Sequence, residues 1–375
     1  MPYSKLLNAL QPTLDRVGLD SVSLIAALSQ GLSNQNYYIR ARRDSSLPKE
    51  WVLRVNSQAS SQLCNRQAEV NNWTLAASND LAPELTYVAE DFSCYLSEFI
   101  PQVSFDWAKI ASAKNAHPLK NDEEIVPNVD KLILPLLKGL QALPLPDNHM
   151  SMTQQWQDYH QALMLMSQGS NADVKATSPA ELGFGIHAEL TMNWLAAFDD
   201  LHQKQTQVKA WLLQLDDCLM TNQFCHRDLN PQNILCHGEQ LVAIDFEYAC
   251  ASHPLWDLAG ILATHGLSSI QRHRLIQSYL HEHPNLTQTA YKAVPASIEL
   301  YWVFAACWAL LMAFSFLDVV KASAITISEM QKVKHDPEAV NLLDESINCA
   351  AVKAREYLDF YTQFAHYISP SMPSR

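Results

Sequence analysis

The sequence predicts an α+β protein with a small antiparallel-sheet lobe followed by a larger, mostly helical lobe. Runs rich in β-branched and aromatic residues, such as Trp51–Val55, alternate with polar turns in the first 100 residues. Farther along, apolar residues recur at helical spacing, as they do in Val208–Met220. We therefore expect residues 1–100 to form the first lobe and residues 101–375 to form the second.

The composition narrows the class of partner and the compartment. The 375 residues carry 26 basic and 39 acidic side chains, a net charge of −13, which disfavours nucleic acid as the main partner. The eight cysteines are scattered without a C-x-x-C pair, and residues 1–30 lack the pattern of a secretory signal. These observations predict a cytoplasmic protein with reduced thiols.

The segment Leu300–Leu317 is long and apolar enough to be considered as a membrane span. It contains no charged residue, but Glu299 and Asp318 abut it directly and no basic cluster marks a cytoplasmic flank. Its aromatic residues and alanines are typical of a helix that is buried on all sides. We therefore predict a core helix and no membrane span.

The elements of the first lobe follow from the spacing of apolar residues. The expected helices are 4–17 and 65–77, and the expected strands are 21–28, 37–40, 51–55, 86–89 and 95–99. A small polar turn, 29–36, separates the first two strands. It suits either a plain hairpin or a loop whose backbone N–H groups cover phosphates.

Two charged residues of this lobe are candidates for a phosphate-binding cation and for the helix glutamate that pairs with it. Arg54 is a long cation in an apolar strand, and Glu69 follows Arg66 in an R-x-x-E pattern on the expected helix. Kinases pair a phosphate-binding cation with a helix glutamate. An ordinary strand-edge cation and a solvated helix glutamate are the alternatives.

A polar loop followed by two apolar runs forms the most informative stretch of the chain. Residues 226–229 read H-R-D-L, and Asn233 follows. The runs 234–236 and 241–244 predict a β-hairpin around a His-Gly turn. Such a hairpin brings Asn233 near Asp245, beside the carboxylate of the H-R-D-L loop.

These residues suit phosphoryl transfer. Mg²⁺ prefers oxygen ligands and takes few protein groups besides phosphate oxygens, so Asn233 and Asp245 are its candidate ligands. A separate carboxylate, Asp228, would accept or orient the proton of the attacking hydroxyl. The alternative is a polar turn and a hairpin whose acids only cap a sheet. The joint order and spacing favour the kinase interpretation.

The same stretch resembles the choline, ethanolamine and thiamine kinases of the aminoglycoside-phosphotransferase superfamily. The resemblance is sharp over residues 224–258 and rests on the H-R-D-L loop, on Asp245-Phe246-Glu247-Tyr248 and on the P-L-W-D-L-A run that begins at Pro254. The D-F-E-Y run differs from the protein-kinase D-F-G in having glutamate in place of glycine. The resemblance implies a two-lobed protein-kinase-like fold with ATP and Mg²⁺ as cofactors.

The resemblance also implies roles for single residues. It implies that the turn before the second strand covers the phosphates and that the backbone around Phe99 meets the adenine. The implied nucleotide-binding residues are Ser33, Asn34, Arg54, Glu69, Glu98 and Ile100. His226 and Asp257 are implied to support the catalytic loop.

A cationic acceptor is expected to contact aromatic faces and a carboxylate. Glu247, Tyr248 and Trp308 are the candidates, although core packing is the alternative for Trp308. Leu311 stands where choline kinases have a second tryptophan, which leaves room for a larger planar cation. The predicted reaction is the ATP- and Mg-dependent phosphorylation of the primary hydroxyl of a small cationic alcohol, choline or ethanolamine first. The alternatives are a thiamine kinase, an aminoglycoside-type or other small-molecule kinase, and a nucleotide-binding pseudokinase.

Overall fold

The computed structural model describes residues 4–28, 34–43, 47–56, 64–102, 107–111, 128–176, 185–332 and 337–370. The chain divides into two compact units, and each is formed by two separate stretches of sequence. Unit 1 comprises residues 1–150 and 218–291, and unit 2 comprises residues 151–217 and 292–375. The lobe boundary expected at residue 100 is a different division of the chain, and it stays a prediction.

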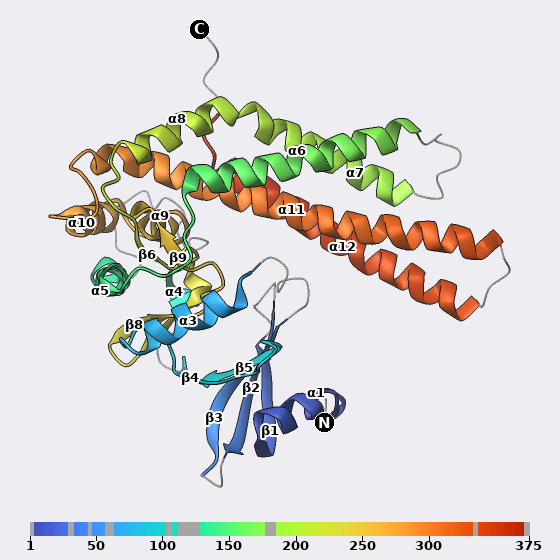
Figure 1. Ribbon diagram of the computed structural model, residues 1–375, viewed down its shortest axis with the longest axis horizontal. Helices are drawn as coiled ribbons and strands as arrows, with labels where there is room; N and C mark the ends of the chain where they lie inside the picture. The colour runs from blue at the N-terminus through green and yellow to red at the C-terminus, as the bar shows by residue number, and fades with distance from the viewer. Residues whose placement is uncertain are drawn as a thin grey trace. The chain divides into compact units, whose positions relative to one another are not determined.

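Unit 1 contains a five-stranded antiparallel sheet with the strand order β1-β2-β3-β5-β4 (Figure 1). Its strands are β1 (Leu19–Leu28), β2 (Asn34–Arg43), β3 (Lys49–Asn56), β4 (Leu85–Val88) and β5 (Cys94–Glu98). Its first helices are α1 (Ser4–Val17), α3 (Arg66–Ala77), α4 (Trp107–Ala111) and α5 (Val129–Ala142). The sequence therefore predicted each strand of this sheet and both helices expected beside it, with bounds shifted by a few residues.

Alternation along β3 places its side chains on two faces of the sheet. Trp51 and Leu53 are buried in the core that α1 closes, together with Leu14 of that helix. Arg54 directly follows Leu53 in sequence and faces the other side, where it is also buried. Tyr95, its partner across the ladder from β5, lies opposite it in the register. The pleat thus separates an apolar core from a buried cation.

Helix α3 begins with a side-chain cap and carries buried polar residues. The side chain of Asn65 accepts a hydrogen bond from the N–H of Ala68 at 3.1 Å, which satisfies one of the free donors of the first turn. The indole N–H of Trp73 donates to the carbonyl oxygen of Pro83 at 2.8 Å. Glu69 and Asn72 are buried on the same helix. A buried polar face of this kind points to partners elsewhere in unit 1.

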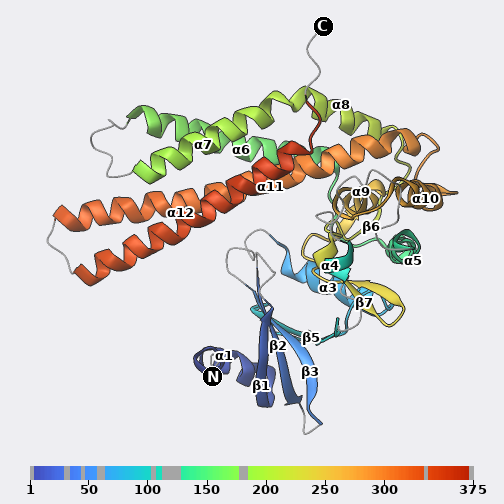
Figure 2. The same cartoon turned by 180° about the vertical axis from the view of Figure 1, so that it is seen from behind.

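Residues 234–243 form the predicted hairpin (Figure 2). Strands β7 (Ile234–His237) and β8 (Gln240–Ala243) pair in the antiparallel register, and Gly238 takes a positive φ of 63° in the turn. The remaining elements of unit 1 are β6 (Gln223–Cys225), a 3-10 turn (Pro231–Asn233), β9 (Cys250–Ser252), α9 (Leu255–Thr264) and α10 (Ser269–Leu280). The hairpin prediction is confirmed.

Unit 2 is built from helices. They are α6 (Met152–Ala176), α7 (Gly185–Gln203), α8 (Gln205–Asp216), α11 (Ala290–Lys332, which begins at the end of unit 1) and α12 (Pro337–His366). The indole N–H of Trp194 on α7 donates to the carbonyl oxygen of Leu310 on α11 at 2.8 Å. The hydroxyl of Tyr361 on α12 donates to Asp200 on α7 at 2.8 Å. These contacts join α7 to both long C-terminal helices.

The apolar segment Leu300–Leu317 lies within α11. By length and composition, the stretch 290–327 is the single candidate span in the part of the chain that the structure describes, and half of its apolar window is buried in the protein. Leu300, Val303 and Leu310 are fully buried there. This burial is what a core helix of unit 2 requires.

Candidate active site

Asp228 lies in the loop between β6 and the 3-10 turn, and two amide side chains hold its carboxylate. Asn233 Nδ2 donates to Oδ2 at 2.7 Å, and Asn230 Nδ2 donates to Oδ1 at 2.9 Å. Burial raises the pKa of Asp228 to about 6, against the lowering effect of the hydrogen bond from Asn230. A carboxyl group with a pKa near neutrality is suited to accept a proton.

His226 and Asp257 fasten the backbone of this loop. The carboxylate of Asp257 accepts the N–H groups of His226 at 2.9 Å and of Arg227 at 2.8 Å. His226 Nε2 lies 3.0 Å from the carbonyl oxygen of Ile244, which can only accept, so Nε2 carries the proton. Its Nδ1 then accepts the N–H of Asp228 at 3.3 Å. Burial lowers the pKa of His226 to about 4, so the ring is a neutral brace at pH 7.

Two residues of the site have left-handed backbone conformations that are uncommon outside glycine. Arg227 has a φ of 73° and Asp245 a φ of 69°. The indole N–H of Trp256 donates to the carbonyl oxygen of Arg227 at 2.8 Å, and the Arg227 guanidinium lies 4.7 Å from the ring centre of the same tryptophan. Strained backbone that is fixed by its surroundings is common at functional sites.

The hairpin brings the two candidate metal ligands together. The N–H of Ile244 donates to the carbonyl oxygen of Asn233 at 2.9 Å. Asp245 is the next residue after Ile244, so the backbone places it close to Asn233. The side-chain nitrogen of Asn233 points to Asp228, which directs its amide oxygen elsewhere. Among the described residues no cluster of three or more His, Cys, Asp and Glu side chains could hold a metal ion. One carboxylate and one amide oxygen fit Mg²⁺, which completes its shell with phosphate oxygens and water.

Arg54 joins the sheet to the hairpin through three carboxylates. Its guanidinium lies 3.0 Å from Glu69, 3.0 Å from Asp245 and 3.4 Å from Glu247. Burial disfavours the charge of Arg54, but Asp245, Glu69 and Glu247 together raise its pKa above the ordinary value. The structure therefore brings the expected phosphate cation, the helix glutamate and the metal carboxylate into one cluster.

Arg66 is a buried member of this cluster whose part in it the sequence did not indicate. Its Nη1 lies 2.7 Å from Glu69 and 3.5 Å from Glu247, and its Nη2 donates to the side-chain oxygen of Asn34 at 3.2 Å. The only signal in the sequence was the R-x-x-E spacing, which places Arg66 and Glu69 on one face of α3.

Glu247 lies among the residues expected to bind the nucleotide. Asn34 Nδ2 donates to its Oε2 at 3.4 Å, and both arginines lie within reach of the same oxygen. Burial and the charge of Asp245 raise the pKa of Glu247 to about 7, against the lowering effect of the arginines. Ser33, expected to cover the phosphates with Asn34, lies outside the described residues.

The segment expected to meet the adenine lies at the end of β5. The N–H of Glu98 donates to the carbonyl oxygen of Glu84 at 3.0 Å, and the Glu98 side chain is exposed. Ile100 is buried, and its carbonyl oxygen lies 3.4 Å from Gln102 Nε2. Gln102 also pairs with both backbone polar atoms of Cys236 at 3.0 Å, which links this segment to β7.

The two aromatic candidates for the acceptor lie in different units. Tyr248 is half-buried in unit 1, directly after the carboxylate cluster. Trp308 is half-buried on α11 in unit 2, where its ring meets Tyr357 edge to face at 5.4 Å. Because Tyr248 belongs to unit 1 and Trp308 to unit 2, the pairing of these residues around one ligand stays a prediction.

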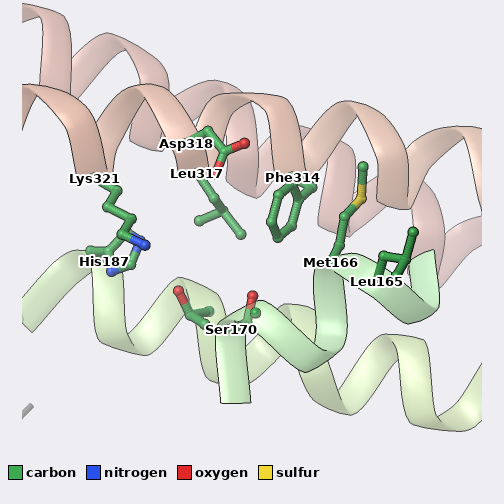
Figure 3. A pocket seen from close by; sticks show the side chains of 10 residues that line it. Leu165, Met166, Ser170, His187, Phe314, Leu317, Asp318 and Lys321 are labelled. Carbon is green, nitrogen blue, oxygen red and sulfur yellow. The ribbon is translucent and has the colours of Figure 1, made fainter. Parts of the chain in front are cut away.

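A cavity of about 320 Å³ lies in unit 2 (Figure 3). Helices α6, α7 and α11 contribute its walls, with the apolar Met166, Phe314 and Leu317 beside the polar His187 and Lys321. None of the sequence-predicted site residues lines it.

Comparison with known proteins, like the geometry of the site, points to a small-molecule kinase. A family model described as Choline/ethanolamine kinase matches residues 25–316. Choline kinase LicA from Streptococcus pneumoniae has a similar structure, with a TM-score of 0.53 and 14% identity over 94% of this chain and 100% of that one. An ethanolamine kinase of Plasmodium vivax gives a TM-score of 0.50 and 17% identity over 88% of this chain and 82% of that one. The kinase-like fold predicted from the sequence is thereby confirmed.

A curated relative matches over a short stretch. Protein LicA of Haemophilus influenzae is 29% identical over 77 residues, which are 20% of this chain. The matched stretch spans 29% of the length of that relative.

Proposed function

Because this chain belongs to the choline/ethanolamine kinase family, a family of small-molecule kinases, we propose that it transfers the γ-phosphoryl group of ATP to the hydroxyl of choline or ethanolamine. The observation that carries the proposal is the meeting of Arg54 with Asp245 at 3.0 Å, while the hairpin holds Asp245 beside Asn233. A cation for phosphate, oxygen ligands for a metal and a buried carboxyl group are thus side by side in unit 1.

The residues divide the chemistry among them. Arg54 would bind phosphate oxygens with its planar fork, and Glu69 keeps that fork in place at 3.0 Å. Asn233 and Asp245 would hold Mg²⁺, which when bound neutralises charge on the phosphate oxygens. Asp228 accepts or orients the proton of the acceptor hydroxyl, and Asn230 and Asn233 fix its two oxygens for that task.

The charge of the site supports a cationic acceptor. Asp228 and Glu247 are acids whose pKa burial raises, so a neighbouring cation would favour their charged forms. Tyr248 directly follows Glu247 and offers an aromatic face to such a cation. A trimethylammonium group would gain from the aromatic face, and a primary ammonium group would gain more from the carboxylate.

An ADP-release assay over an acceptor panel tests the proposal. The panel comprises choline, ethanolamine, thiamine, an aminoglycoside and a neutral alcohol of similar size, each with Mg-ATP. We expect kcat/KM to be highest for choline or ethanolamine and to fall by about 10²–10⁴-fold in Asp228→Asn. Highest turnover of thiamine or of an aminoglycoside would move the substrate to that class, and ATP binding without any turnover would leave a pseudokinase.

A further inference from the structure

The carbonyl oxygen of Ala249 receives two side-chain hydrogen bonds just after the D-F-E-Y run. Asn72 Nδ2 donates to it at 2.7 Å, and Asn148 Nδ2 donates to it at 2.8 Å. The two amides also contact each other, with Asn72 Nδ2 at 3.3 Å from Asn148 Oδ1. A carbonyl oxygen has two lone pairs, so both are used here by side chains from different parts of unit 1.

The two donors connect Ala249 to different elements. Asn148 precedes α6, and its own carbonyl oxygen accepts the N–H of Ala251 at 2.9 Å. Asn148 therefore holds the backbone of residues 249–251 and does not connect it to α3 through these bonds. Asn72 is buried on α3, three residues after Glu69 and therefore on the same helix face. Asn72 is thus the donor that ties the helix of the glutamate to the segment of Asp245.

Two other contacts join α3 to the same segment but fix it less narrowly, and one of them is the long ion pair of Arg66 with Glu247 at 3.5 Å. The ring of Trp73 on α3 lies 6.3 Å from the ring of Phe246, with 24° between their planes. Packing of aromatic rings tolerates small sliding movements, whereas a hydrogen bond weakens steeply when its distance or angle changes. The hydrogen bond from Asn72 therefore fixes the position of α3 relative to the segment, which the ring contact by itself would allow to shift.

We propose that Asn72 is a positioning residue for phosphoryl transfer, which holds Glu69 and Asp245 at the separation that one Arg54 side chain can bridge. Arg54 lies 3.0 Å from each of these two carboxylates. Glu69 comes from α3 and Asp245 from the segment that Asn72 grips, so the link through Ala249 controls both ends of the Arg54 bridge. The inference rests on the proposed function, because it assigns Asn72 to the site where Mg-ATP would bind.

The loss of either asparagine leaves the carbonyl oxygen of Ala249 with one partner. Asn72→Ala and Asn148→Ala each delete one amide, and the other donor still satisfies the oxygen, so both variants retain the segment's own hydrogen bonds. Only Asn72→Ala removes the hydrogen bond from α3 to the segment, while the contacts of Arg66 with Glu247 and of Trp73 with Phe246 remain in both variants. Asn148→Ala is therefore a matched control for the removal of one hydrogen bond to the same atom.

The test compares Mg-ADP affinity, measured by calorimetry, and the steady-state constants for Mg-ATP in the full chain. Asn72→Ala should weaken Mg-ADP binding and raise KM for Mg-ATP by about tenfold, the upper end of what one lost hydrogen bond between neutral groups contributes. Asn148→Ala should stay within about twofold of wild type, since α3 keeps its link. Equal effects of the two variants, or wild-type Mg-ADP affinity in Asn72→Ala, would overturn the proposal.

Two further measurements keep the outcome clear. If Asn72→Ala does not fold, Asn72→Ser carries the same comparison, because its shorter side chain places the hydroxyl out of reach of Ala249. Exchange of backbone amide hydrogens in α3 on addition of Mg-ADP should show protection in wild type and in Asn148→Ala, and little protection in the Asn72 variants. If the wild-type chain binds Mg-ADP but phosphorylates no alcohol, the proposed function is wrong. The comparison of Mg-ADP affinity between the Asn72 and Asn148 variants would still test the role of Asn72.

Discussion

Arg54 Nη1 lies 3.0 Å from Asp245 Oδ1, so the cation expected to bind phosphate and the carboxylate expected to bind metal neutralise each other. Both partners come from unit 1 but from strand β3 and from the end of the hairpin, 191 residues apart in sequence. A metal ion at Asp245 would have to replace Arg54, and a nucleotide would give Arg54 new anions to contact. The two ligands should therefore bind together better than either binds alone.

The first prediction concerns this exchange of partners. Mg²⁺ alone should bind weakly to the wild-type chain, and ADP should increase the Mg²⁺ affinity by tenfold or more, about 1.4 kcal/mol of coupling. Arg54→Gln should bind Mg²⁺ alone more tightly than wild type and should lose most of the coupling. Titration calorimetry with and without ADP measures both terms.

Arg40→Gln is the matched control for the loss of a strand arginine. Arg40 lies on β2 and pairs with Glu50 at 2.7 Å on the surface of the sheet, with more than half of its side chain exposed (58%). Its removal should leave the coupling unchanged, because exposed ion pairs contribute little. Coupling that survives in Arg54→Gln would contradict the exchange.

The second prediction concerns Asp228. Asp228→Asn should lower kcat by about 10²–10⁴-fold, the range typical for loss of a general base, with little change in KM for Mg-ATP. Asn230→Ala removes one hydrogen bond to the same carboxylate and should lower kcat far less, since Asn233 still holds the other oxygen. Steady-state kinetics with saturating acceptor measure both variants. A kcat near wild type in Asp228→Asn would remove Asp228 from the chemistry.

The third prediction concerns Tyr248 and the cationic acceptor. Tyr248→Ala should raise KM for choline by about 2- to 30-fold, the equivalent of a lost contact of ~0.5–2 kcal/mol between a cation and an aromatic face. Tyr248→Phe keeps the ring and should stay close to wild type, and KM for ATP should not change in either variant. If Tyr248→Ala raises KM for choline and KM for a neutral alcohol by the same factor, the aromatic face does not select for a charged acceptor.

The fourth prediction concerns His265, a buried histidine of unit 1 away from the carboxylate cluster. The indole N–H of Trp107 donates to His265 Nε2 at 3.2 Å, and burial lowers the pKa of His265 to about 3. Its pKa in the folded state is below the unfolded value, so its neutral form stabilises the fold above pH 6.5. That contribution is lost as the pH falls from 6.5 toward 3.

The comparison with His265→Gln isolates this effect. Asp228, Asp257 and Glu247 have raised pKa values and act in the opposite direction on acidification, but they do so equally in both proteins. Wild type should therefore lose about 2–3 kcal/mol of unfolding free energy relative to His265→Gln between pH 6.5 and pH 4.5. Urea unfolding at both pH values measures the difference in unfolding free energy between the two proteins. If this difference does not change with pH, protonation of His265 does not destabilise the folded state.

The sequence by itself determined the order of the elements and the side chains that the H-R-D-L loop presents. Strand alternation, helical spacing and the Gly238 turn are local properties, so the sheet, α3 and the β7–β8 hairpin were predictable from short stretches. The placement of Asn233 beside Asp245 followed from the hairpin alone, because pairing of adjacent strands fixes which residues meet.

Only the tertiary structure decided the contacts between stretches that are far apart in the sequence. Nothing local in Asn72 or Asn148 indicates a partner, and the R-x-x-E spacing of Arg66 indicates only Glu69 on the same helix. Arg66 meets Glu247, and Asn72 and Asn148 meet the carbonyl oxygen of Ala249, only because unit 1 buries α3 against the segment after the hairpin. Buried polar groups must find partners, and the fold, which sets the neighbours of α3, decides which partners these are.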